Sequence, residues 1–162
     1  MNELVSELEA EESVDMGSLN HSAIQVNLAF LLKRLGTFSV YTELSLDTSR
    51  LDKNNYKFKE EIKPDVCIYP KRGLSRPYDI IKMSEMPLLA IEVLSPKQGL
   101  QEIVEKIDAY FALGIRSCWL IDPTTAIVVV YTTLENRKIF TAGEVVDDII
   151  GIRLPFDEIF EA

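Results

Sequence analysis

Apolar and polar positions divide the chain into segments with helical periodicity and segments with extended periodicity. Between residues 19 and 36 apolar residues recur every three or four positions, which predicts a helix with Ser18 as N-cap and Gly36 as its C-terminal stop. The next segment, 38–46, alternates apolar and polar residues and predicts one strand, with Glu43 on its polar face. The predicted apolar arc of the helix contains His21, Ile24, Leu28, Leu31, Leu32 and Leu35.

The rest of the chain adds further strands around a second amphipathic helix. The predicted segments are the strands 64–70 and 86–97, the helix 99–114, the strands 117–122 and 126–132, and a strand end with a short helical turn at 151–160. This order of elements predicts a mixed sheet with helices packed against it, an α/β (α+β) fold class. Residues 1–17 are expected to be an acidic lead-in, and residues 18–162 to be a single domain.

The charge is unevenly distributed along the chain. The net charge of −9 does not favour a general electrostatic attraction to nucleic acid. The segment 50–82 nevertheless contains 9 basic and 5 acidic residues. It is either a local patch for a phosphate backbone or a solvated, lysine-rich loop.

Several classes of site and location find little support. Cys67 and Cys118 lie in apolar contexts without metal or redox spacing, so we expect buried free thiols. With His21 as the single histidine, a histidine-rich zinc site and a Ser-His-Asp triad are improbable. No apolar run reaches the ~18 residues of a membrane span, and the acidic N-terminus does not resemble a signal peptide. We therefore expect a cytoplasmic protein with no membrane partner.

Two carboxylates stand in consecutive predicted strands among apolar neighbours. If the strands pair, Asp65 and Glu92 point into one notch. Two ionised carboxylates ~4 Å apart repel by about 4 kcal/mol at an effective dielectric constant near 20, so a divalent cation between them is one solution. The alternative is that Glu92 pairs with Arg116 or a lysine, and that Asp65 only accepts backbone hydrogen bonds.

The order of short motifs resembles a known group of enzymes. Pro64-Asp65, followed 27 residues later by Glu92 in an apolar strand, resembles the PD-(D/E)XK nuclease superfamily. More narrowly, the chain is similar to a bacterial family, abundant in cyanobacteria, of proposed restriction endonucleases, over roughly residues 18–160. The similarity depends on His21, "KPDVCIYP", "IEVLSP", "EKIDAYFALGI", "CWLIDP" and "LPFDEIF".

The resemblance implies a fold and an activity. The fold would be a restriction-endonuclease-like core, helix-strand-strand-strand-helix-strand, with extra strands. The activity would be metal-dependent hydrolysis of phosphodiester bonds in DNA, with Mg²⁺ or Mn²⁺ bound by Asp65, Glu92 and the Val93 carbonyl. Since nucleases of this fold often work as dimers, a homodimer is expected.

The superfamily pattern is broken at one position, because Leu94 stands where the superfamily has its lysine. In the narrower family a lysine on the following helix takes over, and the matching residue is Lys106, with Lys97 as rival candidate. His21 and Glu43 are candidates for supporting the metal site. The missing lysine also leaves open a non-catalytic binding or regulatory domain, or a core domain that needs a partner subunit to recognise DNA.

Overall fold

The computed structural model describes residues 17–58 and 60–162 and centres on a mixed six-stranded sheet. Its strand order is β1-β4-β5-β6-β7-β8, and the pairing is antiparallel except between β5 and β6. The predicted α/β class with a mixed sheet is confirmed. The strands are β1 Phe38–Thr42, β4 Val66–Pro70, β5 Leu89–Val93, β6 Ser117–Asp122, β7 Ile127–Tyr131 and β8 Arg137–Phe140.

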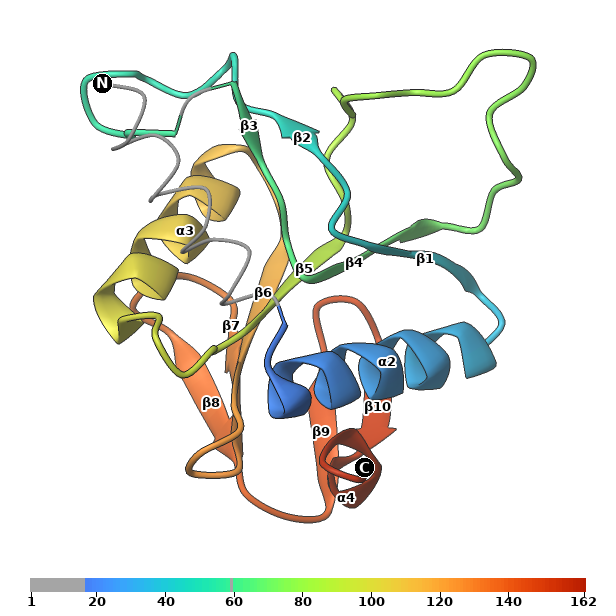
Figure 1. Ribbon diagram of the computed structural model, residues 1–162, viewed down its shortest axis with the longest axis vertical. Coiled ribbons are helices and arrows are strands. Elements are labelled where there is room, and N and C mark those ends of the chain that lie inside the picture. Colours follow the sequence, from blue (N-terminus) through green and yellow to red (C-terminus); the bar gives the residue numbers. More distant parts are fainter. Residues whose placement is uncertain (1–16, 59) are drawn as a thin grey trace.

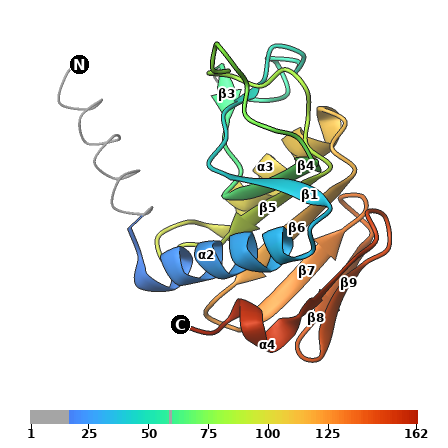
Figure 2. The ribbon, with the colours of Figure 1, turned by 90° about the vertical axis from the view of Figure 1, so that its right-hand side faces the viewer.

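Helices cover both faces of this sheet (Figure 1). On one face α2 (Leu19–Arg34) packs together with α4 (Phe156–Ile159) and the hairpin of β9 (Glu144–Asp147) and β10 (Ile152–Pro155). Figure 2 shows α2 lying along β1. The helix contacts β1, β4 and β5. On the other face α3 (Leu100–Ala112) buries its apolar side against β5, β6 and β7.

The ends of both long helices follow the sequence signals. The side chain of Ser18 accepts a hydrogen bond from the backbone N–H of His21, as an N-cap does. Gly36 and Gly114 follow the two helices with φ of +79° and +93°, a conformation that glycine adopts without a Cβ penalty. Among the described residues, no helix is long and apolar enough to cross a membrane.

Most of the predicted apolar arcs are buried. The arc of α2 buries every predicted member except Leu35, which follows the last helical turn and is 39% exposed. On α3 the predicted apolar residue Leu100 is the first residue of the helix and is 58% exposed, whereas Ile103, Ile107 and Tyr110 are buried.

The single strand predicted over 38–46 is wrong. The chain leaves β1 after Thr42, turns at Glu43 with φ of +52°, and resumes as the two-residue strand β2 (Leu46–Asp47), which pairs with β3 (Glu61–Ile62). The strands β3, β8 and β9 were also absent from the predicted order. β8 is an edge strand with three exposed residues, so it lacks the alternation that marks a half-buried strand.

The topology places three chain segments at one corner of the sheet. Because β4 and β5 are antiparallel, the start of β4 lies beside the end of β5. The crossover from β5 to β6 through α3 starts from that same end. The loop 71–81 leaves the opposite end of β4 and projects from the body of the molecule (Figure 1).

Candidate active site

The strand register brings the two predicted carboxylates together. Val66 pairs with Ile91, so the same register continued by one residue puts Asp65 opposite Glu92. Directly opposed residues of antiparallel strands project from the same face with Cβ atoms about 5 Å apart. Both side chains line one cleft of about 400 Å³, to which β3, α2 and α3 also contribute. The notch expected from the sequence is present.

Asp65 is held from three sides at the bend that precedes β4. Its Oδ2 accepts a hydrogen bond from the backbone N–H of Val93 at 2.7 Å and lies 3.2 Å from Nε2 of His21. Its backbone carbonyl accepts from the side-chain amide of Gln25 at 2.9 Å and from the N–H of Glu43 at 3.3 Å. These contacts fix the carboxylate at the mouth of the cleft, where its side chain is 15% exposed.

His21 reaches Asp65 from the first turn of α2. The hydrogen bond to Asp65 raises the pKa of the imidazole, and burial opposes this rise. The negative charges of Glu92 and Glu43 add to the rise. The other ring nitrogen, Nδ1, is buried and has no hydrogen-bond partner within the described part of the chain. Within the described residues, the His21 side chain thus has one polar contact, and that contact is with a candidate metal ligand.

Glu92 is buried inside β5 with 1% exposure. Its Oε1 lies 2.8 Å from Nζ of Lys106 and accepts a hydrogen bond from the hydroxyl of Tyr110. Burial raises the pKa of Glu92 to about 7, with a further rise from Asp65, whereas Lys106 and Tyr110 lower it. The protein partner of Glu92 is therefore a lysine of the neighbouring helix, and Arg116 remains exposed.

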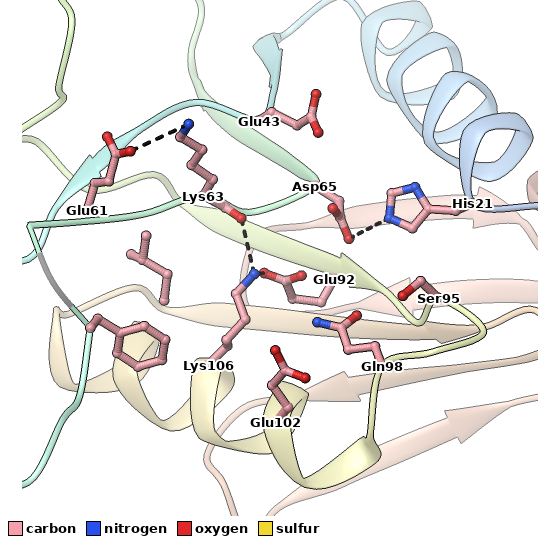
Figure 3. A pocket seen from close by; sticks show the side chains of 12 residues that line it. His21, Glu43, Glu61, Lys63, Asp65, Glu92, Ser95, Gln98, Glu102 and Lys106 are labelled. Atoms are coloured by element: carbon pink, nitrogen blue, oxygen red, sulfur yellow. Dashed lines mark hydrogen bonds and ion pairs between the residues drawn. The ribbon is translucent and has the colours of Figure 1, made fainter. Parts of the chain in front are cut away.

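Lys106 extends from the middle of α3 into the cleft (Figure 3). Its Nζ also donates a hydrogen bond to the backbone carbonyl of Lys63 at 3.2 Å. Burial lowers the pKa of this amine, but the neighbouring Glu92 carboxylate outweighs burial, and the pKa is raised. Lys106 therefore keeps its positive charge within the cleft.

The remaining sequence candidates take different positions. Glu43 lines the cleft and lies beyond Asp65 as seen from Lys106 (Figure 3). Lys97 is exposed and does not line the cleft, as its place after the strand suggests. Val93 is buried, and its N–H is the group that contacts Asp65.

Sequence reasoning missed Tyr110. Periodicity assigns this residue to the apolar face of the second helix, which is correct for its ring but ignores its hydroxyl. The available signal was its spacing of four residues from Lys106, which puts both side chains on one side of the helix.

The donor set fits a hard divalent cation. Within residues 17–58 and 60–162, no group of three or more His, Cys, Asp or Glu side chains is arranged to hold a metal ion. The carboxylates that line the cleft are those of Glu43, Glu61, Asp65, Glu92 and Glu102. Of these, Asp65 and Glu92 lie opposite each other in the strand register, and they do not form a closed cage of the kind that structural zinc requires. Magnesium is commonly bound by one or two carboxylates, with waters and substrate phosphates completing its shell.

Comparisons with known proteins identify the family and the fold. The family model Uma2, described as "Putative restriction endonuclease", matches residues 6–155. A solved structure from Anabaena variabilis ATCC 29413, described as a putative nuclease belonging to DUF820, is 21% identical over 88% of this chain and 81% of that chain, with a TM-score of 0.69. This similarity confirms the predicted restriction-endonuclease-like fold. No curated protein matches the chain.

Proposed function

Because the chain belongs to the Uma2 family of restriction-endonuclease-like proteins, we propose that it is a metal-dependent endonuclease that hydrolyses phosphodiester bonds in DNA. The observation that supports this proposal best is the cleft shared by Asp65, Glu92 and Lys106. Two carboxylates and a lysine are the groups that phosphodiester hydrolysis of this kind needs, and three different elements supply them.

The proposed cofactor is Mg²⁺ or Mn²⁺. Asp65 and Glu92 would hold it, with the Val93 carbonyl as a third ligand. When bound, such an ion supplies a Lewis acid that lowers the pKa of a coordinated water and neutralises charge on the scissile phosphate. His21 and the Val93 N–H keep the Asp65 carboxylate in place for this role.

Lys106 takes the role of the lysine that the superfamily pattern has at position 94. Leu94 packs against the cluster of apolar residues beneath α3 and supplies no charge. The Nζ of Lys106 lies beside Glu92 and is positively charged. We propose that it orients the attacking water and stabilises the negative charge that develops on the phosphate in the transition state.

The basic segment 50–82 supports DNA as the substrate. Its residue Lys63 lines the cleft, next to Glu61 and Ile62 of β3. Lys53 and Lys57, in the segment between β2 and β3, are exposed. A DNA backbone lying over this segment would reach the carboxylates.

We also propose that the protein is a cytoplasmic homodimer. The loop 71–81 presents the exposed apolar side chains of Leu74, Tyr78, Ile80 and Ile81, and a second copy of the chain could cover them. A second copy would supply the second active site that cutting two strands requires. Both cysteines are free thiols, as expected in a reducing compartment. Sedimentation equilibrium tests the assembly, and a monomer at all protein concentrations contradicts it.

A metal titration of thermal stability tests the site. We expect Mg²⁺ or Mn²⁺ to raise the melting temperature of the parent protein, because a ligand bound only by the folded state stabilises it. The substitutions Asp65→Asn and Glu92→Gln should abolish this rise, and also the cleavage of plasmid DNA. Asp122→Asn is the matched control, since Asp122 caps the turn after β6 and lies outside the cleft.

The outcomes separate the proposed enzyme from its alternative. A parent protein without metal-linked stabilisation and without cleavage of DNA would favour a non-catalytic binding or regulatory domain that retains the nuclease fold. Metal-linked stabilisation that survives both cleft substitutions would place the ion elsewhere and contradict the assigned ligands.

A further inference from the structure

We propose that Tyr110 is a positioning residue that selects which carboxylate oxygen of Glu92 faces the cleft. This inference rests on the metal site of the proposed function and adds a residue to it. Tyr110 lies four residues after Lys106 on α3, so the two side chains approach β5 from one side of the helix.

Both side chains of α3 bind the same oxygen. The Tyr110 hydroxyl donates to Oε1 of Glu92, and Nζ of Lys106 lies 2.8 Å from that oxygen. A carboxylate oxygen has two lone pairs in its plane, so two donors saturate Oε1. The other oxygen, Oε2, is the one that these donors leave, and Figure 3 shows it on the side of Glu92 that faces Asp65.

The Tyr110 hydroxyl stabilises this orientation of the Glu92 carboxylate. The terminal torsion of a glutamate has a broad, twofold energy profile, so the two oxygens of an unrestrained carboxylate exchange easily. Lys106 alone is a rotatable donor that also contacts the Lys63 carbonyl. Tyr110 is fully buried, so its ring is fixed by packing and its hydroxyl holds a defined direction.

Tyr110 can only donate in this position. Burial raises the pKa of its hydroxyl well above the ordinary value, and the neighbouring Glu92 raises it further. The phenol therefore keeps its proton, and it is a hydrogen-bond donor and not a base. Its effect on metal binding passes through Glu92.

The test compares two tyrosine hydroxyls. Tyr110→Phe removes the donor to Glu92 and keeps the ring. Tyr69→Phe is the matched control, because Tyr69 is also fully buried and its hydroxyl donates to the carbonyl of Glu85 at 2.7 Å, outside the cleft. The Mn²⁺ dissociation constant of each full-length protein is measured by calorimetry at one pH, and its melting temperature is measured with and without Mn²⁺.

We expect Tyr110→Phe to raise the Mn²⁺ dissociation constant about tenfold, the usual effect of removing a hydrogen-bond partner from a metal ligand. The rise in melting temperature that a fixed concentration of Mn²⁺ produces should shrink for the same reason. Tyr69→Phe should change neither quantity. A purely structural hydroxyl would lower the melting temperature and leave both quantities at their parent values.

Each outcome decides a separate question. If the parent binds Mn²⁺ and Tyr110→Phe binds it equally well at the same pH, the positioning role is wrong and the proposed function stands. If the parent itself binds no Mn²⁺, the metal site and this inference fail together. Should Tyr110→Phe not fold, Tyr110→Met, which also lacks a hydroxyl and keeps a flexible apolar side chain that can fill part of the space, takes its place under the same criteria.

Discussion

The burial of Glu92 disfavours its ionised form, and this should make the free energy of unfolding depend on pH. Its pKa rises from the ordinary 4.5 to about 7 in the folded state, chiefly through burial. Between these two values the folded protein keeps a proton that the unfolded chain has lost. The free energy of unfolding therefore falls as the pH rises through this window, and the favourable contribution is complete only below pH 4.5. His21, whose pKa is raised from 6.5, acts in the same direction at higher pH.

This sign gives a test at the level of one residue. In metal-free buffer, we expect the free energy of unfolding of the parent to decrease between pH 5 and 7. Glu92→Gln should reduce the slope by up to about 1.4 kcal/mol per pH unit, the value for one proton. Urea unfolding at several pH values measures both slopes. Equal slopes would mean that Glu92 is ionised in the folded protein throughout this range.

At the residue scale, the sequence predicted the charged groups of the cleft and missed their neutral partner. Asp65 and Glu92 stood out because carboxylates are rare in apolar strands. Lys106 was predicted from the resemblance to the family, and its place at the border of an apolar helix face supported that prediction. Tyr110 did not stand out, since its ring satisfies the apolar pattern. Hydrogen bonding by a buried hydroxyl depends on which side chain lies opposite, and this information is tertiary.

At the element scale, the break between β1 and β2 combines a strained backbone conformation with a hydrogen bond that positions the start of β4. Glu43 has φ of +52°, a left-handed conformation that costs residues other than glycine about 1–2 kcal/mol. The turn directs the N–H of Glu43 to the carbonyl of Asp65, so it fixes the start of β4 beside the cleft. The alternating pattern of 38–46 concealed the turn, because side-chain polarity contains no signal for a reversed φ.

We expect Glu43→Gly to raise the free energy of unfolding by up to about 1 kcal/mol, since glycine adopts this conformation freely and loses part of the gain to chain entropy. Thr42→Gly is the control on the neighbouring position. Thr42 is exposed and extended at the end of β1, so glycine there should lower the free energy of unfolding by about 1 kcal/mol. Chemical denaturation of the two variants measures this contrast, and a loss of stability in both would contradict the strain at Glu43.

The longer elements were predictable for a reason that the short ones do not share. α2, α3 and the central strands each repeat an apolar pattern long enough to define a period. β2 and β3 contain two residues each, and β8 lies at the sheet edge with three exposed residues. Whether these short strands form depends on the strand beside each of them and on the longer elements that precede and follow them in the chain. The local sequence pattern contains neither kind of information.

At the scale of the whole molecule, an excess of acidic residues surrounds a locally basic segment. The chain has a net charge of −9, yet 50–82 contains four more basic than acidic residues. The structure places part of this segment, at Lys63, in the wall of the cleft. A nucleic acid would therefore be attracted at one place and repelled elsewhere, which restricts how it approaches the carboxylates.

The salt dependence of DNA binding tests this distribution of charge. If Lys53 and Lys57, exposed between β2 and β3, contact phosphates, each contact contributes about −0.9 to the slope of log K against log salt concentration. The double variant Lys53→Gln/Lys57→Gln should reduce the magnitude of the slope by about 2. Lys138→Gln removes an exposed lysine from the edge strand β8, on the far side of the sheet, and should leave the slope unchanged. Fluorescence anisotropy of a short DNA duplex without divalent ions measures binding without cleavage, and equal slopes for all proteins would identify 50–82 as a solvated, lysine-rich loop.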